Sequence, residues 1–156
     1  MKAINAFGGF TLCGACYPEG HVESGTFYEG ITVLKRKYDL GVRCFISQLF
    51  FDNADFLRLR DAAGVACKEA TFEAGIMPAT AVGSLFRMVG ISGAKIPDAL
   101  KAVVDKYGPD KQAMKQAGIE YAVRQIDDLR KEGCEDVHLY TMDNVPVTQA
   151  IIQGIG

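Results

Sequence analysis

The chain has 156 residues, of which 49% are hydrophobic and 23% charged, which suits one soluble domain with a hydrophobic core. Its 17 basic and 19 acidic residues give a net charge of −2, and basic residues cluster only at Lys35-Arg36-Lys37. Nucleic acid is therefore not an expected partner, because phosphate binding needs a concentrated positive surface. No apolar run approaches the ~20 residues that span a bilayer, so no membrane partner is expected.

The chain contains five cysteines, an odd number, and its first residues lack the apolar stretch and cleavage site of a signal peptide. These features predict reduced thiols in a cytoplasmic protein. Cys13 and Cys16 form a C-x-x-C pattern, which elsewhere marks redox or zinc sites. Here the pattern lies in an apolar, strand-like run, where positions i and i+3 face opposite sides. We therefore interpret both cysteines as small buried residues and predict no metal site.

Short apolar runs alternate with longer amphipathic stretches along the chain. The first run, residues 10–16, predicts a strand. A helix is predicted over residues 26–40, where Phe27, Ile31 and Leu34 recur at helical spacing. The other predicted strands are residues 43–48, 71–77 and 136–141, and the other predicted helices are residues 53–66, 82–89, 97–106, 109–132 and 146–152.

This alternation predicts an α/β fold with a parallel sheet built from four βα units. No linker divides the chain, so residues 1–156 are expected to form a single domain. Four parallel strands do not close a barrel. They form half of a (βα)8 TIM-type barrel or a small open α/β sheet, and the pattern alone does not distinguish the two.

Short motifs follow the predicted strands in a definite order. They are Tyr17-Pro18-Glu19-Gly20-His21, Ser47-Gln48-Leu49-Phe50-Phe51-Asp52 and Gly75-Ile76-Met77-Pro78, with Leu34-Lys35-Arg36-Lys37 and His138-Leu139-Tyr140-Thr141 as two further runs. From about Leu12 to Gly156, this ordered set resembles the methylenetetrahydrofolate reductase family, flavin enzymes of one-carbon metabolism. The resemblance implies strands five to eight of the family's FAD-holding barrel, with residues 1–7 as the tail of the preceding helix. Each motif lies at a strand's carboxyl end, where barrel enzymes place their chemistry.

The resemblance implies an FAD-dependent oxidoreductase that uses NADH or NADPH to reduce 5,10-methylenetetrahydrofolate to 5-methyltetrahydrofolate. A phosphate-bearing cofactor needs a cation, which a lysine can supply as a point charge. Without the resemblance, the same tyrosine, histidine and lysine would be interpreted as a strand end, a loop residue and a solvated helix face. The residues that fall on flavin-binding positions or continue the flavin-binding loop are Tyr17, His21, Val22, Glu23, Ser24 and Lys37.

Two further residues fall on substrate positions of the family. Gln48 matches a glutamine that binds the folate ring, and its amide offers both a donor and an acceptor to a pterin edge. Tyr140 matches a substrate-contact position, where its ring can stack and its hydroxyl can bond. The aromatic pair Phe50-Phe51 is interpreted as packing and not as flavin stacking.

The chain departs from the family at several positions. Gly30 stands where the family has an acidic FAD contact, Asn144 where it has an arginine for the folate tail, and Ser84 where some members have a substrate-contacting glutamine. The family's opening half-barrel carries the glutamate that acts as general acid, and this sequence has no match to that half. No catalytic residue is therefore assigned.

Three functional hypotheses follow. The chain is part of a reductase whose opening half comes from another polypeptide, a non-catalytic half-barrel that binds a flavin or nucleotide, or an unrelated small α/β domain. Gly30 and Asn144 favour the second hypothesis, while Gln48 and Tyr140 favour the first. A half-barrel has two unpaired edges, so we expect a homo-oligomer or a complex with an N-terminal half. Its inner face is expected to expose Val, Ile and Phe side chains.

Overall fold

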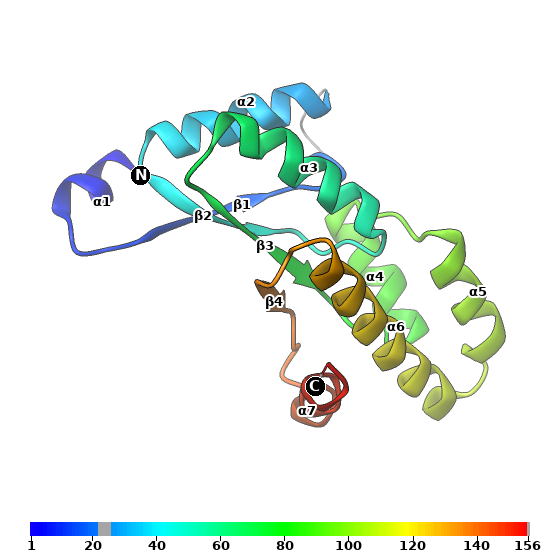
Figure 1. Ribbon diagram of the computed structural model, residues 1–156. Coiled ribbons are helices and arrows are strands. Elements are labelled where there is room, and N and C mark those ends of the chain that lie inside the picture. The colour runs from blue at the N-terminus through cyan, green and yellow to red at the C-terminus, as the bar shows by residue number, and fades with distance from the viewer. Residues whose placement is uncertain (22–25, 156) are drawn as a thin grey trace.

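Four parallel strands form one sheet in the order β1-β2-β3-β4 in the computed structural model, which describes residues 1–21 and 26–155 (Figure 1). All three neighbouring pairs are parallel. The four βα units predicted from the sequence are thereby confirmed, and the last strand is shorter than predicted. The strands are β1 (Leu12–Cys16), β2 (Val42–Ser47), β3 (Thr71–Ile76) and β4 (Val137–Leu139).

Helices separate the strands, as predicted. Figure 1 shows α2 and α3 together over the β1 and β2 end of the sheet, with α4, α5 and α6 gathered at the other end. Within the described residues, every helix is too short or too polar to cross a bilayer. The helices are α1 (Lys2–Phe7), α2 (Phe27–Asp39), α3 (Asn53–Ala66), α4 (Val82–Ser92), α5 (Asp98–Tyr107), α6 (Lys111–Lys131) and α7 (Val145–Gly154).

Side-chain caps fix where several helices begin. Thr26 and Glu29 form a capping box at the start of α2, in which each side chain accepts a hydrogen bond from the other residue's backbone N–H. Asp110 accepts hydrogen bonds from two backbone N–H groups at the start of α6. Helix α4 runs three residues beyond its predicted end, because the left-handed residue that stops it is Gly93, with φ 74°.

The hydrophobic core lies between the sheet and the helices. Phe45 of β2 packs with Leu34 of α2 and Leu59 of α3 in one buried cluster. Ile76 of β3 packs with Ile126 of α6 in a second cluster, which also includes residues of α3 and α7. A third cluster joins the loops after β2 and β3 to α4, α5 and α6. The carboxyl ends of the strands are therefore held by packing on the helical side.

The opposite face of the sheet carries mainly polar groups. Ile46, which pairs with Glu73, lies on it and is half-buried, so the expectation of exposed Val, Ile and Phe side chains there holds for Ile46 but not for Val or Phe residues such as Val42 and Phe45, which pack against the helices. Glu73 lies on this face, where its carboxylate accepts a hydrogen bond from the Cys44 thiol at 3.1 Å and lies 3.9 Å from Nδ1 of His138. The large apolar strand residues, such as Phe45 and Ile76, face the helices instead.

The same alternation separates the two cysteines of the C-x-x-C pattern. Cys16 is buried against the helices, while Cys13 lies on the opposite face and is exposed. The predicted divergence of the two side chains is confirmed, but the prediction that both are buried is wrong for Cys13. Burial raises the pKa of the Cys16 thiol to about 12, and burial with the Glu73 hydrogen bond raises that of Cys44 to about 12.

Cys13 is expected to react first with a thiol reagent. At pH 8, iodoacetamide should label it well before Cys16 and Cys44, because those two thiols are buried and remain protonated. Peptide mass spectrometry over a time course measures the order, and Cys13→Ser should remove the fast phase. Fast labelling of Cys16 or Cys44 would contradict the described burial.

Candidate functional site

The motifs that follow the predicted strands meet at the carboxyl ends of these strands. Tyr17, Gln48, Pro78 and Tyr140 each follow a strand, and the strands are parallel and adjacent. The backbone continues the pairing there, since the Gln48 N–H donates to the Cys16 carbonyl at 2.8 Å and the Tyr140 N–H donates to the Ile76 carbonyl at 2.8 Å. The sequence prediction that these residues share the carboxyl end of the sheet is confirmed.

A cavity of about 370 Å³, here called the α2 cavity, lies between the loop after β1 and helices α2 and α3. Tyr17 and His21 from the loop line it together with Gly30 and Lys37 from α2. Three predicted flavin-position residues and the position of the missing acidic contact therefore surround one space. The predicted positions Val22, Glu23 and Ser24 lie outside the described residues.

The polar groups of the α2 cavity are held by specific contacts. The Tyr17 and His21 rings meet edge to face, with centroids 4.6 Å apart. Lys37 is half-buried and its ammonium donates to the Ala15 carbonyl at 2.6 Å. Burial lowers the pKa of Lys37, and the nearby Cys16 thiol acts in the opposite direction. The helix therefore places a cation beside the end of β1.

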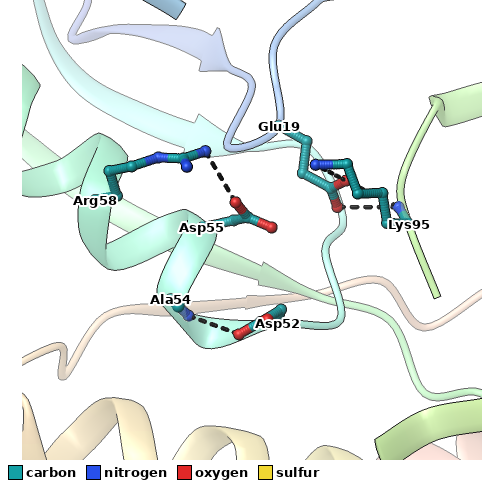
Figure 2. A network of polar contacts seen from close by, with 6 residues as sticks. All are labelled: Glu19, Asp52, Ala54, Asp55, Arg58 and Lys95. Carbon is teal, nitrogen blue, oxygen red and sulfur yellow. Dashed lines mark hydrogen bonds and ion pairs between the residues drawn. The ribbon is translucent and has the colours of Figure 1, made fainter. Parts of the chain in front are cut away.

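Glu19 anchors the loop that carries Tyr17 and His21. Its side chain is 7% exposed, and both carboxylate oxygens accept the Lys95 backbone N–H, at 3.1 and 2.9 Å. The Lys95 ammonium lies 3.7 Å from the same carboxylate (Figure 2). Burial, together with the negative Asp55, raises the pKa of Glu19, while Lys95 opposes that shift. The contact joins the loop after β1 to the segment between α4 and α5.

Gln48 is half-buried and lies at the end of β2, the strand between β1 and β3. Its Oε1 accepts the backbone N–H of Leu49 at 2.9 Å, so the side chain is oriented by its own loop. Gln48 does not line the α2 cavity as the structure describes it. The structure thus places Gln48 at the carboxyl end of the sheet, as predicted, but outside the cavity that Tyr17, His21 and Lys37 line.

A second cavity, of about 270 Å³ and here called the α4 cavity, lies between the ends of β3 and β4 and helix α4. Tyr140, Pro78, Ser84 and Asn144 line it, together with Arg87. It therefore contains the predicted substrate tyrosine and two of the positions at which the chain departs from the family.

Tyr140 and Asn144 are both fixed in place by hydrogen bonds. The Tyr140 hydroxyl donates to the Ser47 carbonyl at 2.8 Å, and burial raises the pKa of the phenol. The Asn144 Oδ1 accepts the Val147 N–H at 3.3 Å as the cap of α7. Tyr140 therefore offers a ligand its ring, and Asn144 offers the nitrogen of its amide.

Two residues of this region were not singled out from the sequence. Glu19 stood inside a quoted motif, and an acidic residue next to an apolar strand was the signal that could have identified it. Arg87 lies on α4 with no motif around it. Its place in the lining of the α4 cavity depends on the packing of α4, which local sequence does not reveal.

Four parallel βα units with cavities at the carboxyl ends of the strands define an α/β protein of barrel type. The sequence pattern that describes methylenetetrahydrofolate reductases matches residues 1–156. The chain belongs to the methylenetetrahydrofolate reductase family.

Individual relatives agree with this assignment. The 5,10-methylenetetrahydrofolate reductase of Pectobacterium carotovorum subsp. carotovorum is 28% identical over 156 residues, which are 100% of this chain and 52% of the relative. The enzyme of the same name from Escherichia coli (strain K12) is 29% identical over 147 residues, 94% of this chain and 50% of the relative. The chain therefore spans about half the length of these relatives.

A plant relative and a solved structure extend the comparison. Methylenetetrahydrofolate reductase (NADH) 1 of Zea mays is 29% identical over 160 residues, 95% of this chain and 26% of the relative. The solved structure is an uncharacterized protein from Clostridium thermocellum that binds two copies of 5-methyl-5,6,7,8-tetrahydrofolic acid. It superimposes with a TM-score of 0.67 over 98% of this chain and 56% of that chain, at 13% identity. At this identity the likeness supports the fold alone.

Proposed function

We propose that this chain is the flavin- and folate-binding half of a methylenetetrahydrofolate reductase, and that it acts with a second half-barrel. The reaction is the reduction of 5,10-methylenetetrahydrofolate to 5-methyltetrahydrofolate with NADH or NADPH as electron donor. The observation that carries the proposal is that Tyr17, His21 and Lys37 surround one cavity in a member of this family. The cytoplasmic location stays a prediction.

The residues of the α2 cavity fit a flavin nucleotide such as FAD. Lys37 supplies a cation for a phosphate, and Tyr17 and His21 supply aromatic surfaces. The loop positions Val22, Glu23 and Ser24 belong to the same proposed site through the family resemblance. A Cβ atom built at Gly30 meets nothing within 4 Å, so the cavity has free space on its α2 side.

Within this proposal, the bound flavin supplies hydride chemistry and the protein binds, orients and excludes water. Gln48 orients the pterin through its amide, whose Oε1 already holds the Leu49 N–H and whose nitrogen remains as donor. Tyr140 presents its ring to the substrate from a position fixed by Ser47. No acid for the folate is assigned in this chain, because that group is expected from the other half of the barrel.

The experiment that tests flavin binding replaces His21 and Lys37 together by alanine. The wild-type chain is expected to retain or take up FAD with its yellow absorbance, and the double variant to lose it, because an aromatic contact and the cation are both removed. Lys35→Ala is the matched control, since it removes a positive charge from an exposed ion pair on the same helix. Equal FAD occupancy in the double variant and the wild type would contradict the assignment.

A gain of affinity is expected from Gly30→Asp. The site has room for the side chain, and a carboxylate there can accept hydrogen bonds from the sugar hydroxyls of a flavin nucleotide. The expected gain in FAD affinity is about tenfold, the effect of one hydrogen bond to a charged group. Fluorescence titration with FAD measures it.

Gly30→Ala is the control for that variant. It should stabilise the chain against urea by about 0.5–1 kcal/mol, because glycine is costly inside a helix, and leave FAD affinity unchanged. If both variants change FAD affinity alike, the effect comes from helix stability and the carboxylate contact is wrong.

The alternative function is a non-catalytic half-barrel that binds a flavin or nucleotide. The specific observation in its favour is that Asn144, at the position of a folate-tail arginine, serves as a helix cap. Binding of FAD without any binding of 5-methyltetrahydrofolate would favour this alternative.

A further inference from the structure

We propose that Arg87 is the carboxylate-binding residue of the α4 cavity, and that it confers preference for ligands with a negatively charged tail. The inference deepens the proposed function and rests on it for the identity of the ligand. The positive charge for the ligand's tail then comes from Arg87 on α4, and not from the loop between β4 and α7, where Asn144 stands at the family's arginine position.

The lining of the α4 cavity favours an anion. Among the described residues that line it, Arg87 is the one with a formal charge. Asp143, the acidic residue of the neighbouring loop, does not line the cavity. The remaining polar groups are neutral, namely hydroxyls such as that of Ser84 and the amide of Asn144. A carboxylate entering this space therefore meets one cation in the lining and no lining anion.

The guanidinium of Arg87 is available for such a ligand. No ion pair or hydrogen bond joins it to another residue within 1–21 and 26–155, whereas Arg58 and Arg60 are held by Asp55 and Asp61. Arg87 is exposed and lines the cavity. An arginine keeps its charge at all working pH values and presents a planar fork that matches both oxygens of a carboxylate.

Asn144 is a second lining residue that can donate to an anion. Its Oδ1 is occupied by the Val147 N–H, so the amide group is fixed and its nitrogen is left as a donor. The preceding Met142 and Asp143 have φ values of 48° and 57°, which turn the loop sharply before Asn144. Arg87 and Asn144 thus present donors from two separate elements, while Tyr140 and Met77 offer apolar surface to the body of the ligand.

A folate has the required shape, because its glutamate tail carries carboxylates and its ring system is largely flat. The test uses 5-methyltetrahydrofolate and its analogue with both tail carboxylates converted to amides, titrated against the chain by calorimetry. The wild type should bind the acid about tenfold more tightly than the amide. Arg87→Gln should remove this preference without changing the affinity for the amide, and Arg87→Lys should retain part of it.

Lys101→Gln is the matched control, because it also removes one positive charge from an exposed helix position but lies on α5, outside the cavity. It should keep the full preference. Equal binding of acid and amide by the wild type would overturn the Arg87 proposal while leaving folate binding intact.

p-Aminobenzoylglutamate, which has the tail but no pterin, separates the two proposals further. Arg87-dependent binding of this fragment without binding of 5-methyltetrahydrofolate would support the carboxylate site and count against the proposed function. Binding of none of the three ligands would overturn both.

Discussion

Gly75→Ala is expected to destabilise the chain by about 3 kcal/mol or more, because the added methyl group has no space. A Cβ atom at this position would lie 2.2 Å from the Ser47 carbonyl oxygen and 2.8 Å from a ring carbon of Tyr140. Both neighbours are themselves restrained. The Tyr140 hydroxyl donates to that carbonyl, and the Gly75 N–H donates to the Ser47 hydroxyl at 2.8 Å.

The substitution should therefore separate β2 from β3 and displace Tyr140, since relief of the overlap breaks these hydrogen bonds. Urea unfolding measures the free energy of unfolding. Gly90→Ala is the control, because a Cβ atom there meets nothing within 4 Å and the residue lies within α4, where alanine is favoured. A Gly75→Ala chain as stable as the wild type would mean that the described strand spacing is wrong.

The isolated chain is expected to associate and to show no turnover with methylenetetrahydrofolate. Each outer strand pairs on one side only, β1 with β2 and β4 with β3, so two rows of backbone donors and acceptors lack a strand partner in the described sheet. Such edges invite another chain, and β1 contains no charged residue to prevent this. Pairing with an N-terminal half-barrel, and not with a second copy, is expected to restore folate reduction.

Light scattering at micromolar concentration, combined with an NADH- and NADPH-dependent reduction assay, tests both parts. Cys13→Lys should weaken association, because a charge on the exposed face of β1 disfavours pairing of this edge. Val65→Lys is the control, since Val65 is 77% exposed and lies on α3 and not on an outer strand. A stable wild-type monomer would refute association, and turnover without a partner would refute incompleteness.

The order of strands and helices could be predicted because each follows a local pattern. Apolar runs such as Leu12–Cys16 and the helical spacing of Phe27, Ile31 and Leu34 mark element positions within a few residues. The end of α4 was missed, since Gly90 directly after Val89 has the form of a stop signal, whereas the helix continues through it and ends at Gly93. The polarity of the inner sheet face was also missed, because it depends on which face each strand residue takes.

The candidate site was only partly predictable, because some of its residues are brought together by contacts between distant segments. Tyr17, Gln48 and Tyr140 each follow a strand. Because the strands are parallel, their common location at the carboxyl end of the sheet could be predicted from the sequence. The Glu19 contact with Lys95 and the position of Arg87 join segments far apart in the chain. Such contacts arise from helix packing, which a single sequence does not specify.

If the chain acts with a separate N-terminal half-barrel, as proposed, the mainly polar inner face of the sheet affects how it behaves before assembly. The unassembled sheet presents Cys13, Glu73 and His138 on that face, and these groups can remain hydrated. Closing a barrel over them removes water from a carboxylate, which costs free energy and offsets part of the gain from new strand pairs. Assembly of the halves should therefore be reversible and selective for a partner with matching donors. Under the proposal, hydration of this face lets the unassembled chain persist in water until it meets such a partner.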